Sequence, residues 1–119
     1  MSLTIISFGY LHGEPPAADI TQDMRPYRDP HVNPEMRQLT GRDQDVILTV
    51  LNTPGVMDVI ADLVAKAGEP SGPRTIAVGC AGGRHRSVVV ADIVTRSLQH
   101  MGRQVTVTHR DIDLPVVNR

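Results

Sequence analysis

The most chemically suggestive part of the sequence is a short glycine-rich segment, Cys80-Ala81-Gly82-Gly83-Arg84-His85-Arg86-Ser87. An apolar run precedes it and a helical pattern follows it, which places it between a strand and the start of a helix. The first N–H groups of a helix lack intrahelical partners and carry partial positive charge, so they attract anions. The segment therefore predicts an anion-binding loop, with a phosphate group as the best-suited ligand.

Both the backbone and the side chains of this loop are expected to contribute. Gly82 and Gly83 permit positive φ values that let successive amides converge on one anion. Arg86, together with either Arg84 or His85, is predicted to face the ligand, and Ser87 to add a hydroxyl. The loop lacks the Gly-Lys-Ser/Thr ending of a Walker A motif, so ATP hydrolysis is not expected.

An enzymatic alternative rests on the spacing of Cys80 and Arg86. Cys-x5-Arg followed by serine resembles the signature of cysteine-dependent phosphatases, in which a thiolate attacks phosphorus. A general acid would then be needed, and loop aspartates offer candidates: Asp23, Asp29 and Asp111. A buried cysteine that closes a strand is the simpler interpretation, and Gly79 stands where many such phosphatases carry histidine. A non-catalytic binding site is therefore preferred, with the phosphatase kept as the alternative.

The remaining polar residues suggest no metal or cofactor. His31, His85 and His109 with Cys80 match no zinc-binding spacing. His109 and Arg110 follow a predicted strand. Because ligands of α/β sheets collect at the carboxyl ends of strands, these two residues are expected near the loop.

The elements that must position this loop follow from the apolar patterns. Strands are predicted over residues 4–9, 18–24, 75–79 and 105–108, and helices over 43–51, 54–68 and 85–101. Thr53 is predicted as an N-cap and Pro54 as the first residue of the second helix. Because strands and helices alternate, the chain is predicted to be one small α/β domain over residues 1–119, with a short sheet flanked by helices.

Composition narrows the class of protein. The net charge of −1 does not favour a polyanion-binding protein, although eleven of the twelve basic residues are arginine, which suits phosphate. A single cysteine excludes an internal disulfide. The sequence has neither a signal-peptide pattern nor an apolar run of about 20 residues, the length that spans a membrane. A cytoplasmic protein without a membrane partner is expected.

Several segments occur together in an order that resembles one family. They are Ser7-Phe8-Gly9-Tyr10, Asp23-Met24-Arg25, Asp29-Pro30-His31, Leu39-Thr40-Gly41-x-Asp43, Gly79 to Val88, and His109-Arg110-Asp111. This combination resembles the C-terminal domain of the RapZ (YvcJ) family of RNase adapter proteins. The resemblance runs from Thr4 to Asp111.

The resemblance implies a binding domain rather than an enzyme, similar in fold to a sugar-phosphate-binding subdomain of phosphofructokinase. The implied ligand is an amino sugar phosphate such as glucosamine-6-phosphate, sensed by an adapter that needs no cofactor. Structured RNA, a protein partner and self-association are further expectations from the family. By position, the phosphate would be held by Gly82, Gly83, His85, Arg86 and Ser87, with Asp23, Arg25 and His31 around it and His109 and Arg110 at its border.

Two departures from the family pattern bear on RNA. The sequence holds no Walker-motif domain before the resembling region, so it is interpreted as a stand-alone C-terminal domain. Residues 111–119 do not form the basic cluster that ends some family members. Since RNA binding depends on phosphate neutralisation, a local patch would have to supply it: Arg25, Arg28, Arg84 and Arg110. An RNA-binding adapter without metabolite sensing is the other alternative.

Overall fold

The computed structural model describes residues 2–69 and 71–118. Four strands form one parallel sheet in the order β2-β3-β1-β4. Their bounds are Leu3–Gly9 for β1, Ile20–Asp23 for β2, Thr75–Cys80 for β3 and Val105–His109 for β4. The predicted α/β class, with a glycine-rich loop between a strand and a helix, is confirmed.

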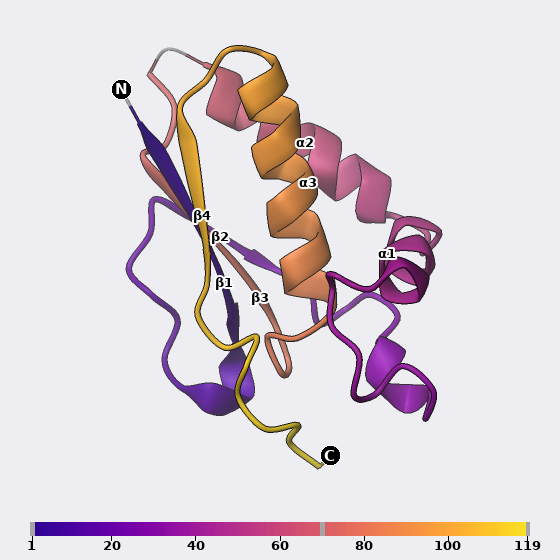
Figure 1. Ribbon diagram of the computed structural model, residues 1–119. Helices are drawn as coiled ribbons and strands as arrows, with labels where there is room; N and C mark the ends of the chain where they lie inside the picture. The colour runs from indigo at the N-terminus through magenta and orange to yellow at the C-terminus, as the bar shows by residue number, and fades with distance from the viewer. Residues whose placement is uncertain (1, 70, 119) are drawn as a thin grey trace.

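The three α-helices lie on the same side of the sheet (Figure 1). They are α1 (Gln44–Leu51), α2 (Val56–Gly68) and α3 (Arg86–His100), and two short 3-10 turns, η1 (Tyr10–His12) and η2 (Pro30–Val32), complete the chain. The predicted sheet flanked by helices is thus a sheet covered on one face. Among the described residues, no single helix is long and apolar enough to cross a membrane, and only α1 and α2 counted as one bent segment meet those criteria.

An aliphatic core fills the space between the sheet and the helices. Alternate residues of the central strands point into it, because side chains of a strand alternate between its two faces. The strand contribution is Leu3, Ile5, Ile76, Val78 and Cys80, and α3 contributes Val90, Ala91, Val94 and Leu98. Each fully buried aliphatic side chain stabilises the fold by about 1.5–3 kcal/mol. This packing holds the start of α3 rigidly against the ends of β1 and β3.

The predicted start of the second helix is wrong. The helix α2 begins at Val56, and its N-cap is Gly55 rather than Thr53. Thr53 instead donates its hydroxyl to the carbonyl of Thr49 at 2.8 Å, which closes the end of α1. Gly55 has a φ of 91°, a left-handed conformation that favours glycine, and this lets the chain turn sharply between the two helices.

The parallel register brings the motif segments to one edge of the sheet. Gly9 at the end of β1 pairs with Cys80, and Asp23 at the end of β2 pairs with Gly79. Ser7 pairs with His109 at the end of β4. The carboxyl ends of all four strands, and the turn from β3 into α3, therefore lie at the lower edge of the sheet in Figure 1.

Candidate anion-binding site

The backbone of the glycine-rich loop presents a row of donors. Among the described residues, the N–H groups of Gly82, Gly83, Arg84 and His85 donate no hydrogen bond. They precede α3, a helix of fifteen residues whose dipole places partial positive charge at the same point. Gly83 has a φ of 68°, whereas Gly82 has no positive φ, so the predicted left-handed conformation applies to Gly83 only. Free amides at a helix N-terminus are a typical anion-binding arrangement.

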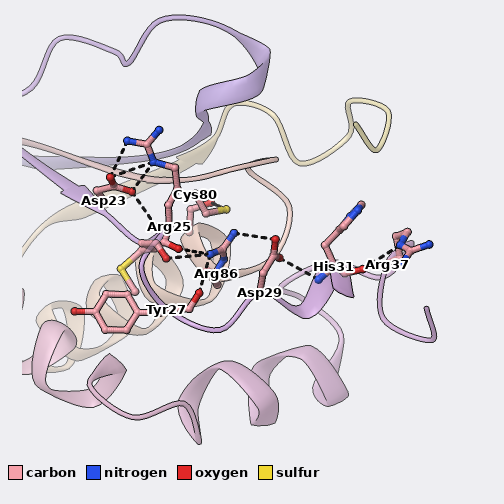
Figure 2. Close-up of polar contacts among 10 residues, drawn as sticks. Asp23, Arg25, Tyr27, Asp29, His31, Arg37, Cys80 and Arg86 are labelled. Atoms are coloured by element: carbon pink, nitrogen blue, oxygen red, sulfur yellow. Dashed lines mark hydrogen bonds and ion pairs between the residues drawn. The ribbon is translucent and has the colours of Figure 1, made fainter. Parts of the chain in front are cut away.

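Arg86, the first residue of α3, is buried behind this loop with 2% of its surface exposed. Its Nη1 donates to the carbonyls of Met24 at 3.2 Å, Arg25 at 3.1 Å and Tyr27 at 2.9 Å (Figure 2). Its Nη2 lies 3.3 Å from Oδ2 of Asp29. Its Nε is buried and has no hydrogen-bond partner in the described part of the chain. Arg86 therefore anchors residues 24–29 to the loop, and its Nε remains unused.

Arg84 and His85 hold a different segment against the loop. Nε of Arg84 donates to the carbonyl of Leu39 at 2.9 Å, and its Nη2 donates to that of Gln38. Nε2 of His85 lies 2.8 Å from the Leu39 carbonyl and 3.0 Å from that of Met36. Burial lowers the pKa of the His85 imidazole, although these carbonyls favour the protonated form. The neutral ring consequently serves as a hydrogen-bond donor to the backbone.

A cavity of about 10 Å³ lies beside the loop. It is lined by Asp29, His31, Cys80, Gly82, Arg84, His85, Arg86 and the C-terminal residues Leu114, Pro115, Val116 and Val117. A space of about 10–15 Å³ holds one water molecule. The structure therefore brings five of the sequence-predicted ligand residues to one small cavity: His31, Gly82, Arg84, His85 and Arg86.

Cys80 lines this cavity. The residue is 2% exposed, and its Sγ lies 3.1 Å from Oγ of Ser87. Cys80 also belongs to the apolar core, which matches the structural interpretation of this cysteine. The hydroxyl of Ser87 is thus engaged with sulfur at the base of the loop.

Asp23 and Arg25 lie at the rim of the loop, outside the residues that line the cavity. Their side chains form an ion pair with an Nη2–Oδ2 distance of 2.8 Å, and the guanidinium stands 3.7 Å from the centroid of the Tyr10 ring. The hydrogen bonds from Arg25 lower the pKa of the Asp23 carboxyl. This pair is exposed, and the charges of its carboxylate and guanidinium cancel, so the pair adds little net charge to the site.

His109 and Arg110 are also placed away from the cavity. Nδ1 of His109 lies 2.6 Å from Oγ of Ser7, and its Nε2 lies 2.7 Å from Oδ1 of Asp92 on α3. Arg110 pairs with its neighbour Asp111 at 2.9 Å.

Asp111 supports the end of β1. Its Oδ2 accepts the Gly9 N–H at 2.8 Å. Burial alone would raise the pKa of the Asp111 carboxyl, but the hydrogen bonds from Arg110 and Gly9 outweigh it and the pKa is lowered. Among the described residues, no group of three His, Cys, Asp or Glu side chains is arranged to hold a metal ion.

Two features of the site were not foreseen from the sequence. Asp29 was considered only as a general acid, and its pairing with Arg86 was missed because the two lie far apart along the chain. The contribution of residues 114–117 was also missed. The sequence does carry a signal for this contact. Residues 114–117 are apolar and include two valines, whereas a tail exposed to solvent is usually polar.

Comparison with known proteins finds one family. A sequence model described as the RapZ C-terminal domain matches residues 1–113. A nucleotide-binding protein of Streptomyces coelicolor is 38% identical over 117 residues, covering 92% of this chain and 39% of the relative. A nucleotide-binding protein of Sphingopyxis alaskensis is 40% identical over 119 residues, covering 93% and 38% respectively. The chain spans about two fifths of the length of these relatives.

Proposed function

Because the chain belongs to the RapZ C-terminal domain family, we propose that it is a binding domain for a phosphorylated small molecule. The phosphate group occupies the N-terminus of α3, where it accepts from the amides of the loop. An amino sugar phosphate such as glucosamine-6-phosphate is the proposed ligand, and the domain acts as a sensor or adapter rather than as an enzyme.

The observation that carries this proposal is the set of free amides from Gly82 to His85. Four successive amides without a protein acceptor at the start of a helix can all donate to one anion. Arg86 also lines the cavity, and its buried guanidinium adds positive charge and an unused donor at Nε. A phosphate oxygen satisfies both kinds of group.

Calorimetric titration tests the proposal directly. We expect glucosamine-6-phosphate to bind with an enthalpy signal, and inorganic phosphate to compete with it. The matched variants are Gly82→Glu and Gly82→Gln, which add side chains of similar size and different charge. Because a carboxylate repels the anion, Gly82→Glu should weaken binding at least about tenfold more than Gly82→Gln, a difference of about 1.4 kcal/mol. Equal effects, or no binding by the parent chain, would contradict the proposal.

A second candidate function is phosphatase activity at Cys80. It is favoured by one observation, the Sγ–Oγ contact of 3.1 Å between Cys80 and Ser87 in a loop that also carries Arg86. Hydrolysis of an aryl phosphate by the parent chain, lost in Cys80→Ser, is the expected signature. If the parent chain does not hydrolyse the aryl phosphate, the phosphatase function is excluded and only the binding function remains.

RNA binding, which the family resemblance also implies, has weaker support. Three of the four arginines in the patch considered for RNA are paired or bonded within the chain, namely Arg25, Arg84 and Arg110. A gel shift with structured RNA tests this function, and a shift that weakens steeply with salt would be expected of phosphate contacts.

A further inference from the structure

The C-terminal segment covers the proposed phosphate site. After β4 the chain turns at Asp111 and Ile112, and Leu114–Val117 then line the cavity opposite the loop. Figure 1 shows this segment, in yellow, running beside the turn that joins β3 to α3. The remaining space of about 10 Å³ suffices for one water molecule but not for a phosphate group with its five heavy atoms. A ligand can enter only if part of this wall moves.

Arg84 holds the C-terminal segment through two long contacts. The Arg84 guanidinium donates to the carbonyls of Ile112 and Leu114 at 3.4 and 3.5 Å, at the limit of hydrogen-bond distance. The same side chain donates a shorter bond, of 2.9 Å, to the carbonyl of Leu39 outside the cavity. Among the bonds of Arg84, those to the C-terminal segment are therefore the weaker ones.

Packing leads to the same conclusion. Leu114 and Pro115 are exposed, and Val116 and Val117 are half-buried. None of the four belongs to the apolar core, whereas the other walls of the cavity include Cys80, which does. Displacing the segment therefore leaves the apolar core intact.

We propose that Leu114–Val117 is a displaceable strap that competes with a phosphate group for the loop. Arg84 exchanges the carbonyls of the strap for phosphate oxygens as the strap leaves. The inference rests on the proposed phosphate-binding function and adds its regulation. Since ligand binds only the strap-open form, the apparent affinity is reduced by the fraction of molecules that are open. By linkage, ligand binding must also release the strap.

The first experiment compares the full chain with a chain ending at Asp113, using inorganic phosphate as the probe. We expect the shortened chain to bind phosphate about tenfold more tightly, because no strap has to be displaced before phosphate can bind. Thermal unfolding checks that both chains fold. The double variant Val116→Ser with Val117→Ser loosens the strap without changing any charge and should shift affinity in the same direction. The control, Met101→Ser, alters an exposed apolar residue beyond the far end of α3 and should leave affinity unchanged.

The second experiment follows the strap itself by amide hydrogen exchange of the full chain. Exchange at Leu114, whose N–H donates to the carbonyl of Asp111 at 3.1 Å, should accelerate when phosphate is added. Equal affinities of the full and shortened chains, with no change in exchange, would overturn the strap and leave the proposed function standing. Failure of both chains to bind phosphate and glucosamine-6-phosphate would overturn the proposed function and the strap together.

Discussion

Gly9 at the end of β1 and Gly83 in the glycine-rich loop are packed backbone against backbone. A Cβ placed on Gly9 would lie 2.6 Å from the Gly83 nitrogen, and one placed on Gly83 would lie 2.5 Å from the Gly9 nitrogen. Neither position has room for a side chain. The loop amides are therefore held in place by direct contact with the central strand of the sheet.

This contact predicts that Gly9→Ala and Gly83→Ala each lower the free energy of unfolding by about 2–4 kcal/mol, through overpacking and, at Gly83, backbone strain as well. The measurement is urea unfolding. Gly102→Ala is the matched control, because Gly102 has a φ of 89° but no atom within 4 Å of an added Cβ. It should lose only about 1–2 kcal/mol from the left-handed conformation. A Gly83→Ala loss no larger than that of Gly102→Ala would argue against the close contact.

The pairing of Arg86 with Asp29 predicts a second effect on stability. Asp29→Asn leaves the buried guanidinium without its carboxylate and should cost about 1–3 kcal/mol, less than for a fully buried pair because Asp29 is 21% exposed. Asp62→Asn removes the carboxylate of an exposed pair with Lys66 and should cost about 0.5 kcal/mol or less. Chemical unfolding of the two variants side by side makes the comparison. Equal losses would mean that Arg86 does not depend on Asp29.

The lowered pKa of His85 predicts a pH dependence of stability. Above about pH 6.5 the imidazole is neutral in both states. As the pH falls below that value the unfolded chain binds a proton more readily than the folded chain, so the free energy of unfolding decreases toward the lower pKa of the folded state. Thermal unfolding between pH 7.5 and 5.5 should show this loss. In His85→Gln the slope over the same window should be smaller, whatever the stability of the variant at pH 7.5.

The contacts of His109 predict a structural role for this residue. Ser7→Ala removes the partner of Nδ1 and should cost about 1–2 kcal/mol, the usual range for a buried donor or acceptor left unpaired. The affinity of the folded variant for phosphate should not change, because neither residue lines the cavity. Titration of the same sample tests this. A weakened affinity would place His109 at the ligand after all.

The sequence was sufficient to predict the strand, loop and helix that form the site. An apolar run into Cys80, two glycines and a helical pattern from Arg86 are local signals, and local signals determine where elements begin. The start of α2 was mispredicted because Thr53-Pro54 also fits the end of the preceding helix. Gly55 determines that α2 starts at Val56 and not at Pro54. Its left-handed φ depends on how α1 and α2 pack.

The partners of the loop side chains were not predictable in the same way. Arg84, His85 and Arg86 were expected to face an anion, since donors beside a helix N-terminus suit that purpose. Much of their bonding capacity goes to carbonyls of residues 24–27 and 36–39, which lie in an irregular segment without periodicity. Only the tertiary arrangement shows which carbonyls need a donor. The position of residues 114–117 over the cavity depends on the same arrangement.

The order of the strands also governs when the site can form. The central strand β1 has no neighbour along the sheet until residues 75–80 are available, and its other neighbour, β4, is made only after α3. Such distant pairings make folding slow, since the chain must close long loops before the contacts that stabilise them exist. During synthesis on the ribosome β1 therefore remains an unpaired apolar strand. Exposed strands of this kind make a nascent chain prone to aggregation. A ligand present in the cell at that stage has no assembled loop to bind, and it can act on this protein only after β3 and the start of α3 have been made.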